Sequence, residues 1–286
     1  MSSIETKPLH DRVALVTGAN TGIGLVTARE LARAGARVFI ACRTAANAET
    51  AAQQIRQSSG SQLVESLTLD LGDFASVRRC AAEFLALDSP LHLLINNAGL
   101  AGQRGFTTSG FELAFGVNHL GPFLLTNLLL ERLRASAPAR IVTVASRAHT
   151  RSAGLDWEAC QKPTRTRLAI KEYADSKLAN VLFSAELARR LAGSGVTTYA
   201  LHPGVVASDI WRKVPWPLSS LIKRRMMTTD EGAKTSLHCA MASELSAKTG
   251  LYYDKCAERE ASALGRDTTL ADELWRRSEA WTGLKP

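Results

Sequence analysis

Apolar runs of strand length alternate with longer helical patterns from residue 11 to about residue 205. Short runs rich in apolar and β-branched residues predict buried strands, and apolar residues recurring every three or four positions predict helices. This alternation is typical of βαβ units, which build a parallel sheet covered by helices on both faces. We therefore expect an α/β fold with a doubly wound, Rossmann-like parallel sheet in three α/β/α layers.

The expected elements follow one another in regular order. The strands are Arg12–Val16, Arg37–Ala41, Leu63–Leu69, Leu91–Asn96, Arg140–Ala145 and Thr197–Leu201, with a weaker one at Gly250–Tyr253. The helices are Leu25–Ala34, Ala45–Gln57, Phe74–Leu87, Glu112–Arg134 and Ala174–Leu191. The charged tail after about Ala257 is expected to form a surface helix.

Two long segments interrupt the alternation, Arg147–Glu172 and Ser208–Asp230, and each follows a predicted strand. In open α/β sheets ligands bind beyond the carboxyl ends of the strands, so insertions there more often build a substrate pocket than an idle loop. We expect the first to enlarge a substrate cavity and the second, at about 208–230, to be a substrate lid. The whole chain, 1–286, is expected to be a single domain.

Length and composition agree with a soluble globular protein. The chain has 286 residues, 45% hydrophobic and 22% charged, values that exclude a disordered or fibrous protein. The first twelve residues are polar, and no segment approaches the roughly 18 apolar residues of a transmembrane helix. Five cysteines without CxxC spacing favour reduced thiols. We therefore expect a cytoplasmic protein.

The chain is basic, with a net charge of +8 and an isoelectric point near 9.5. Such a charge suits nucleic acid, a membrane surface or a phosphate-rich cofactor, and composition does not choose among them. The basic residues are dispersed, without zinc-ligand spacing, an RNA-binding aromatic strand or a basic coiled coil. We therefore expect no nucleic-acid binding and no metal site.

A glycine-rich turn, TGANTGIG at residues 17–24, directly follows the first predicted strand. Gly18 would allow a sharp turn, Gly22 the approach of backbone to a pyrophosphate, and Gly24 close packing of the next helix on the sheet. The first turn of that helix offers unpaired N–H groups and a positive dipole end to an anion. A turn without a ligand is the alternative, but the strand–turn–helix context favours a dinucleotide. The contact residues expected here are Gly18, Asn20, Thr21, Gly22, Ile23 and Gly24.

The second predicted strand ends in a cation where an NAD site usually has a carboxylate. That carboxylate binds the ribose 2′-hydroxyl of NAD, whereas the 2′-phosphate of NADP calls for a cation. Arg43 follows the strand directly, and its guanidinium can pair with a phosphate while stacking on adenine. A solvated surface arginine is the alternative. Given the dinucleotide site, we predict NADPH/NADP+ as the cofactor.

Tyr173 and Lys177 lie four residues apart in a predicted helix, and hence one turn apart on one face. A free phenol titrates near pH ~10, so a tyrosine that exchanges a proton at neutral pH needs adjacent positive charge. Alone, this spacing more often marks a surface pair. Ser146 follows the strand Arg140–Ala145, where its hydroxyl would hold a substrate carbonyl or, alternatively, cap a turn. Asn118 lies in a helical pattern although asparagine is a poor helix former.

These motifs together resemble the short-chain dehydrogenase/reductase family, and in particular its NADPH-dependent retinol dehydrogenase branch. The resemblance rests on the GxxxGxG turn, INNAG at 95–99, YADSK at 173–177 and LHPGVV at 201–206, with matching helices from about residue 10 to 255. It implies hydride transfer between a nicotinamide and a carbonyl carbon, with a tyrosine exchanging the proton. The catalytic residues that it implies are Asn118, Ser146, Tyr173 and Lys177.

The resemblance also implies cofactor contacts outside the glycine turn. They are Arg43, Asp70, Leu71, Asn97, Ala98, Gly99, Tyr173, Lys177, Pro203, Gly204, Val205 and Ser208. Within this set, Asp70 would bind the adenine amino group, Val205 the carboxamide and Ser208 a phosphate. Three neighbours receive structural roles: Asn96 within the sheet, Asp73 as a helix cap, and His119 as a packed or exposed helical residue rather than a second base.

The branch implies a lipophilic aldehyde or ketone, similar to retinaldehyde, interconverted with its alcohol. Two features depart from it: we expect no apolar N-terminal anchor like that of microsomal members, and alanine precedes Ser146 where a serine pair is usual. A steroid or other bulky carbonyl is an alternative substrate. A non-catalytic dinucleotide-binding scaffold or sensor is an alternative of another class, although a scaffold has no need of all four catalytic residues.

The segment 210–227 holds five basic residues, two tryptophans and no acidic residue. A lid whose apolar side covers the substrate is the simpler interpretation. Peripheral contact with an anionic membrane surface through the same segment is the sharper hypothesis. A homodimer is a further expectation, because members of the family often pair through their long helices.

Overall fold

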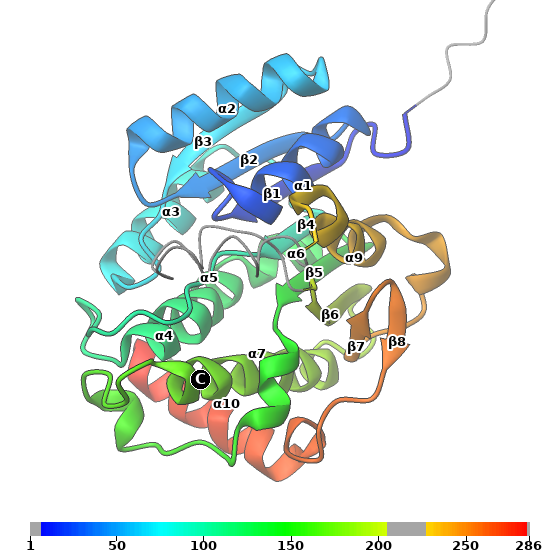
Figure 1. Cartoon of the computed structure of the whole chain (residues 1–286). Coiled ribbons are helices and arrows are strands. Elements are labelled where there is room, and N and C mark those ends of the chain that lie inside the picture. Colours follow the sequence, from blue (N-terminus) through cyan, green and yellow to red (C-terminus); the bar gives the residue numbers. More distant parts are fainter. Residues whose placement is uncertain (1–6, 205–226, 285–286) are drawn as a thin grey trace, which may run out of the picture.

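Eight strands form one sheet in the order β3-β2-β1-β4-β5-β6-β7-β8 in a computed structural model (Figure 1). The structure describes residues 7–204 and 227–284. Strands β1 to β7 run parallel, and β8 pairs antiparallel with β7. All seven predicted strands are present, and the three-residue β8 was not predicted. The bounds are β1 Val13–Thr17, β2 Arg37–Cys42, β3 Val64–Thr68, β4 Leu93–Asn96, β5 Ala139–Val144, β6 Val196–His202, β7 Leu251–Asp254 and β8 Ala257–Arg259.

Helices cover both faces of the sheet, which confirms the expected three layers. One face carries α1 (Gly22–Arg33), α2 (Ala45–Ser59) and α9 (Thr229–Met241), whose Leu31, Ile55 and Cys239 join one buried cluster with β1, β2 and β4. The other carries α3 (Phe74–Ala86), α5 (Gly121–Leu128) and α7 (Ile170–Arg190). Shorter elements are α4 Leu113–Phe115, the π-helical turn Gly116–Leu120, α6 Leu130–Ala135, and 3-10 turns at Arg147–Arg151, Ala159–Gln161, Ser243–Leu245 and Leu264–Arg266.

The order of the strands places a crevice between β1 and β4. The chain adds β2 and β3 on one side of β1, then crosses over and adds β4 to β8 on the other. At such a switch point the connections leave toward opposite faces, which opens a binding crevice beyond the carboxyl ends. β1 ends at Thr17 and β4 at Asn96, so the glycine turn and the Asn97–Gly99 segment meet there.

The prediction of one long helix over Glu112–Arg134 is wrong. The segment is divided into α4, the π-helical turn Gly116–Leu120, α5 and α6. Gly121 packs so closely on Leu71 that an added Cβ would collide with its carbonyl oxygen. Pro122 follows in the first turn of α5 and has no N–H for the helix ladder. The hydrogen-bond pattern of the helix therefore changes at this point, while helical dihedral angles continue through Gly121 and the break between α5 and α6 falls at Leu129.

The C-terminal tail forms α10 (Thr268–Thr282), which is more than a surface helix. It lies along α7 (Figure 1). Leu274 and Trp275 are only 1% and 4% exposed. Charged residues are spread along this helix between the members of a narrow apolar stripe at helical spacing.

Trp275 joins α10 to both α5 and α7. Its ring meets Phe123 edge-on with 4.9 Å between centroids and stacks on Phe183 at 5.9 Å. The Arg190 guanidinium lies 4.4 Å from the ring centroid. Truncation of the Trp275 side chain would leave a large cavity and remove its contacts with Phe123, Phe183 and Arg190.

We therefore predict that Trp275→Ala lowers the free energy of unfolding by about 3–5 kcal/mol, the usual cost of removing a buried tryptophan. Urea denaturation followed by circular dichroism measures it. Arg276→Ala, next along α10 and exposed, is the control and should change stability by less than about 0.5 kcal/mol. Equal small losses in both variants would contradict the packing role of α10.

Candidate active site

A cleft of about 550 Å³ lies at the switch point, beyond the carboxyl ends of the central strands. Most of the predicted site residues form its walls: Gly18, Asn20, Thr21, Gly22, Ile23, Gly24, Arg43, Asp70, Leu71, Asn97, Ala98, Gly99, Tyr173, Lys177 and Pro203. Asn118, Ser146 and Gly204 are not among the lining residues. Val205, Ser208 and the membrane-contact segment through residue 226 lie outside the described residues.

The glycine turn is held to the end of β4 by hydrogen bonds from both sides. The Thr17 hydroxyl accepts from the backbone N–H groups of Asn97 at 3.1 Å and Ala98 at 3.0 Å. The Asn97 amide donates back to the Thr17 carbonyl at 2.8 Å and to the Gly18 carbonyl at 3.3 Å. These bonds fix the two walls of the cleft relative to each other.

Two glycines in the turn have no tolerance for a side chain. Gly18 has φ +65°, and a Cβ there would lie 2.8 Å from the Cα of Ala98. A Cβ on Gly24 would lie 2.5 Å from the Gly18 carbonyl oxygen and collide with the Asn97 amide. The turn is therefore tight because the backbone itself touches neighbouring backbone.

The first turn of α1 faces the cleft without a side-chain cap. Thr21 occupies the N-cap position in an extended conformation, and its side chain makes no capping hydrogen bond. No acidic residue stands in the first turn. The backbone N–H groups of a helix N-terminus that no side chain occupies favour an anion. The donor set fits a pyrophosphate.

Arg43 stands exposed at the rim of the cleft, directly after β2. Among residues 7–204 and 227–284 its guanidinium has no ion-pair or hydrogen-bond partner. Asp70, at the same end of the cleft, accepts from the Gly72 N–H at 2.9 Å through one carboxylate oxygen. A cation and a carboxylate thus flank the position where an adenosine would lie.

Tyr173 and Lys177 project from the first turns of α7 into the cleft, as their spacing predicts. The helix begins at Ile170, four residues earlier than expected. The Lys177 ammonium lies 5.7 Å from the centroid of the Tyr173 ring and donates to the Val144 carbonyl at 2.8 Å. Burial lowers the pKa of Lys177 to about 8, so most of the charge is still present at pH 7. Burial raises the pKa of Tyr173.

Ser146 takes the capping role considered for it, and its contact with a substrate carbonyl stays a prediction. It is the N-cap of the turn Arg147–Arg151, and its hydroxyl oxygen accepts from the Ala148 N–H at 3.1 Å. The Ser146 side chain also acts to lower the pKa of Tyr173, against the larger effect of burial. Since the backbone donor occupies one lone pair, the hydroxyl proton is free to point at the phenol.

Asn118 lies under the floor of the cleft, 1% exposed. Its amide oxygen accepts from the Leu100 N–H at 2.8 Å, and its amide nitrogen donates to the Ser176 hydroxyl at 2.9 Å. A Cβ on Gly99 would lie 3.2 Å from the Asn118 amide oxygen and 3.4 Å from the Lys177 nitrogen. Asn118 therefore supports the loop between the cleft and the catalytic helix.

The Asn118 backbone carbonyl lacks its ordinary helical partner. The donor four residues later is Pro122, which has no N–H. The π-helical turn around Asn118 widens the backbone at the same point. The backbone carbonyl of Asn118 is therefore left without an α-helical donor, whereas both polar atoms of its side-chain amide are hydrogen-bonded.

The neighbouring residues expected to be structural are so. The Asn96 amide donates to the Thr126 hydroxyl at 2.9 Å inside the core. The Asp73 carboxylate caps α3 by accepting from the Ala75 N–H at 2.9 Å. His119 is buried at 1% exposure and its Nε2 lies 3.0 Å from the Ser278 hydroxyl of α10.

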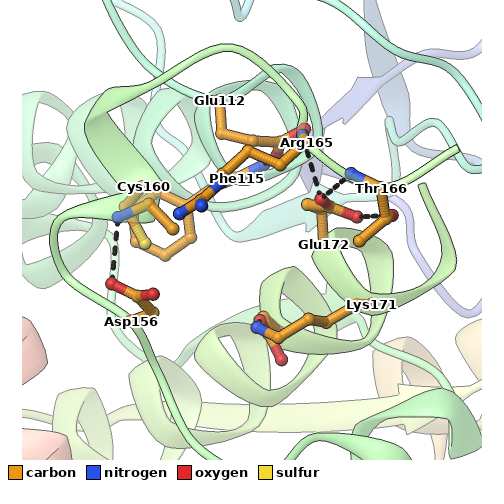
Figure 2. A pocket seen from close by; sticks show the side chains of 10 residues that line it. Glu112, Phe115, Asp156, Cys160, Arg165, Thr166, Lys171 and Glu172 are labelled. Carbon is orange, nitrogen blue, oxygen red and sulfur yellow. Dashed lines mark hydrogen bonds and ion pairs between the residues drawn. The ribbon is translucent and has the colours of Figure 1, made fainter.

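The segment 147–172 does not enlarge this cleft: none of its residues lines it. It folds instead over the start of α7 and forms a second pocket of about 210 Å³ with Phe115 on its wall (Figure 2). Figure 2 shows Glu172 turned to the loop, where it accepts from the Arg165 and Thr166 N–H groups. The segment is thus fastened to the start of α7.

The predicted lid is shorter than expected at its C-terminal end. Thr228 caps α9 by accepting from the Glu231 N–H at 3.2 Å, and the Glu231 carboxylate accepts from the Thr228 N–H at 2.8 Å. This reciprocal capping box starts a helix at Thr229. Residues 228–230 therefore belong to α9, and the rest of the predicted lid lies outside the described residues except Met227, which packs against Gly204.

The sequence-family model described as short chain dehydrogenase matches residues 12–216 of this chain. The chain belongs to the short-chain dehydrogenase family. Mouse retinol dehydrogenase 12 is 48% identical to it over 280 residues, which cover 96% of this chain and 87% of the relative. Human dehydrogenase/reductase SDR family member 13 is 46% identical over 287 residues, covering 97% of this chain and 75% of the relative.

Solved structures show the same fold. An uncharacterised protein from Mycobacterium paratuberculosis superposes with a TM-score of 0.78 at 35% identity, covering 98% of this chain and 96% of the other. The RhlG/NADP active-site complex from Pseudomonas aeruginosa has a TM-score of 0.69 at 29% identity, covering 88% and 97%. No helix in the described part of this short-chain dehydrogenase is long and apolar enough to cross a bilayer.

Several walls of the cleft were not predicted from the sequence. They come from the loop after β4 and from the start of the next helical segment: Leu100, Gln103, Phe106, Thr107, Thr108, Leu113 and Val117. Phe106 is 45% exposed although it is aromatic. The signal available was the position of this loop directly after a parallel strand, where ligand-binding loops gather.

His119 joins the π-helical turn that carries Asn118 to α10, and burial lowers its pKa to about 3. The unfolded chain takes up a proton near pH ~6.5, whereas the folded protein does not until near pH 3. Folding stability is therefore lost as pH falls below about 6.5, by up to about 1.4 kcal/mol per pH unit from this residue.

We predict that in His119→Gln the free energy of unfolding falls less steeply as pH is lowered from 6 to 4. The difference from the parent protein should be about 1.4 kcal/mol per pH unit. The free energy of unfolding, measured by urea denaturation at several pH values, reports it. His10→Gln changes an exposed histidine and should show the same dependence of unfolding free energy on pH as the parent protein. Parallel curves for His119→Gln and the parent would refute the assignment.

Proposed function

We propose that this short-chain dehydrogenase is an NADP(H)-dependent oxidoreductase that interconverts a lipophilic, retinaldehyde-like aldehyde or ketone with its alcohol. The observation that carries the proposal is that Tyr173 and Lys177 line the same cleft as an uncapped glycine turn, with Ser146 close enough to lower the pKa of Tyr173. A proton donor and an anion cradle in one cleft suit a nicotinamide dinucleotide and a carbonyl.

The residues of the cleft fit the cofactor part by part. The N-terminal N–H groups of α1 suit the pyrophosphate, Arg43 a 2′-phosphate, and Asp70 an adenine amino group. Gly99 leaves room beside Lys177, where ribose hydroxyls would be held. A nicotinamide bound there supplies or accepts the hydride.

The proton that the substrate oxygen gains or loses is exchanged with a side chain of this protein. Tyr173 donates to the carbonyl oxygen in reduction and accepts from the alcohol in oxidation. Its burial opposes the phenolate, while the Ser146 side chain and the Lys177 charge favour it. Ser146 would hold the substrate oxygen against the phenol, and the Asn118 carbonyl would accept a water linked to Lys177.

The substrate class follows from relatives and from the wall of the cleft. Relatives near 48% identity carry the name retinol dehydrogenase, and Leu100, Phe106 and Leu113 give the cleft an apolar wall. A steroid or another bulky carbonyl would suit the same wall. NADPH oxidation over retinoid, alkenal and steroid carbonyls separates these, and no turnover on any of them would favour a dinucleotide-binding scaffold.

Homodimer formation, cytoplasmic location and membrane contact through 210–227 stay predictions. α10 packs on α7, so a pair built on the long helices would have to form around it. Size-exclusion chromatography measures the oligomeric state, and sedimentation with anionic liposomes measures the membrane contact.

Removing the Tyr173 hydroxyl tests the chemistry. We predict that Tyr173→Phe lowers kcat by about 10²–10⁴, the usual contribution of a general acid, while the Kd for NADPH measured by fluorescence stays within about threefold. Tyr253→Phe is the matched control, because the Tyr253 hydroxyl is buried without a partner in the described structure. Unchanged turnover in Tyr173→Phe would refute the assignment.

Replacing the cation after β2 tests the choice of cofactor. A charge-assisted hydrogen bond contributes about 1.5–3 kcal/mol, so Arg43→Ala should raise KM for NADPH about 10- to 100-fold. KM for NADH should change little. Arg79→Ala, an exposed arginine of α3 outside the cleft, is the control. Equal effects on both cofactors would exclude recognition of the 2′-phosphate by Arg43.

A further inference from the structure

A buried histidine lies directly behind the active-site serine. His149 is three residues after Ser146, in the 3-10 turn Arg147–Arg151, and is only 1% exposed. Its ring meets the Tyr252 ring of β7 edge-on, with 4.9 Å between centroids. It does not line the cleft, so it does not touch the substrate.

Its two ring nitrogens have fixed and opposite roles. Nε2 lies 3.1 Å from the backbone N of Ser262, which can only donate, so Nε2 accepts. The proton of the neutral ring is therefore on Nδ1, which donates to the Ser146 carbonyl oxygen at 2.7 Å. Burial lowers the pKa of His149, which favours this neutral form.

The hydrogen bond to Ser146 fixes the conformation of its backbone. The same carbonyl oxygen also accepts from the His149 N–H at 3.1 Å. Ser146 is extended, with φ −166° and ψ 155°, and these two bonds oppose rotation about ψ. Because the direction of the hydroxyl follows from the backbone, they also determine how it meets the Tyr173 phenol.

The support of this turn comes from distant parts of the chain. Arg147 pairs with Asp254 at 2.5 Å, which fastens the turn to the end of β7. Tyr252, two residues earlier on the same face of β7, backs the His149 ring. Ser262 belongs to the segment after β8. The position of Ser146 thus depends on the C-terminal part of the fold.

We propose that His149 is a positioning residue for Ser146, holding its carbonyl through Nδ1 while Ser262 and Tyr252 hold the ring. The inference rests on the proposed function, since it affects turnover only where Ser146 acts on the substrate. Loss of this bond lets the serine hydroxyl turn from the substrate oxygen, and a small misplacement of a catalytic group costs up to about 100-fold in rate.

A double-mutant cycle distinguishes positioning from general support of the fold. His149→Phe retains a ring against Tyr252 and removes both hydrogen bonds. We expect it to lower kcat about 10- to 100-fold, with KM for NADPH within about twofold. In a Ser146→Ala background, the same substitution should change kcat less than about threefold, because residues that act through one another are not additive.

The matched control is His238→Phe. His238 lies on α9 and meets Tyr253 of β7 at 6.0 Å, on the opposite face of the sheet. Its substitution should leave kcat within about twofold. Melting temperatures of all variants show whether each is folded.

A second pair of variants decides the matter even where His149→Phe does not fold. Asparagine places an amide near the position of Nδ1, and glutamine places one near Nε2. His149→Asn should therefore recover most of the turnover and His149→Gln should not. Equal losses in the parent and Ser146→Ala backgrounds, no loss in His149→Phe, or better turnover in Gln than in Asn would overturn the inference.

The outcome is separable from the proposed function. If Ser146→Ala itself turns over as fast as the parent, the role of Ser146 fails and with it the basis of the inference. If Ser146→Ala is slow and His149→Phe is fast, only the positioning role fails.

Discussion

The hydrogen bonds between Thr17 and the Asn97–Ala98 segment are the constraint on which the site depends. They join the carboxyl ends of β1 and β4, where the two halves of the sheet separate. Because the Asn97 amide reaches the Gly18 carbonyl, the glycine turn and the loop leading to Asn118 share one support. A Cβ added at Gly18 or Gly24 would collide with the segment around Asn97 and Ala98. The close contact between the glycine turn and this segment therefore determines both the tightness of the turn and the shape of the cleft.

On the side of the cleft that holds Tyr173 and Lys177, burial makes the charged forms of both side chains unfavourable. Lys177 is 4% exposed and donates to the Val144 carbonyl, yet no carboxylate pairs with it among the described residues. Burial disfavours its charge and also the Tyr173 phenolate. Each charged form therefore gains more from the other than it would in water, because electrostatic interactions strengthen where solvent is excluded.

The parts of the site that local chemistry determines were predictable from the sequence. A glycine turn after an apolar strand, Arg43 after the next, and Tyr173 four residues before Lys177 are local patterns, and the structure brings them into one cleft. The π-helical turn before Gly121 was not predicted, and neither was the close approach of Gly121 to Leu71, which comes from tertiary packing. The inward face of α10 was concealed by its charges for the same reason.

His149 shows the limit of sequence patterns most directly. Nothing local distinguishes it from a surface histidine in a polar turn, because the groups that bury its ring lie outside that turn. They are the backbone N–H of Ser262 and the ring of Tyr252. Both are over a hundred residues away, and one of them is not a side-chain contact at all. A backbone donor leaves no mark on residue type, so only the fold identifies which ring nitrogen carries the proton. The dependence of Ser146 on the far end of the chain is therefore a property of the tertiary structure alone.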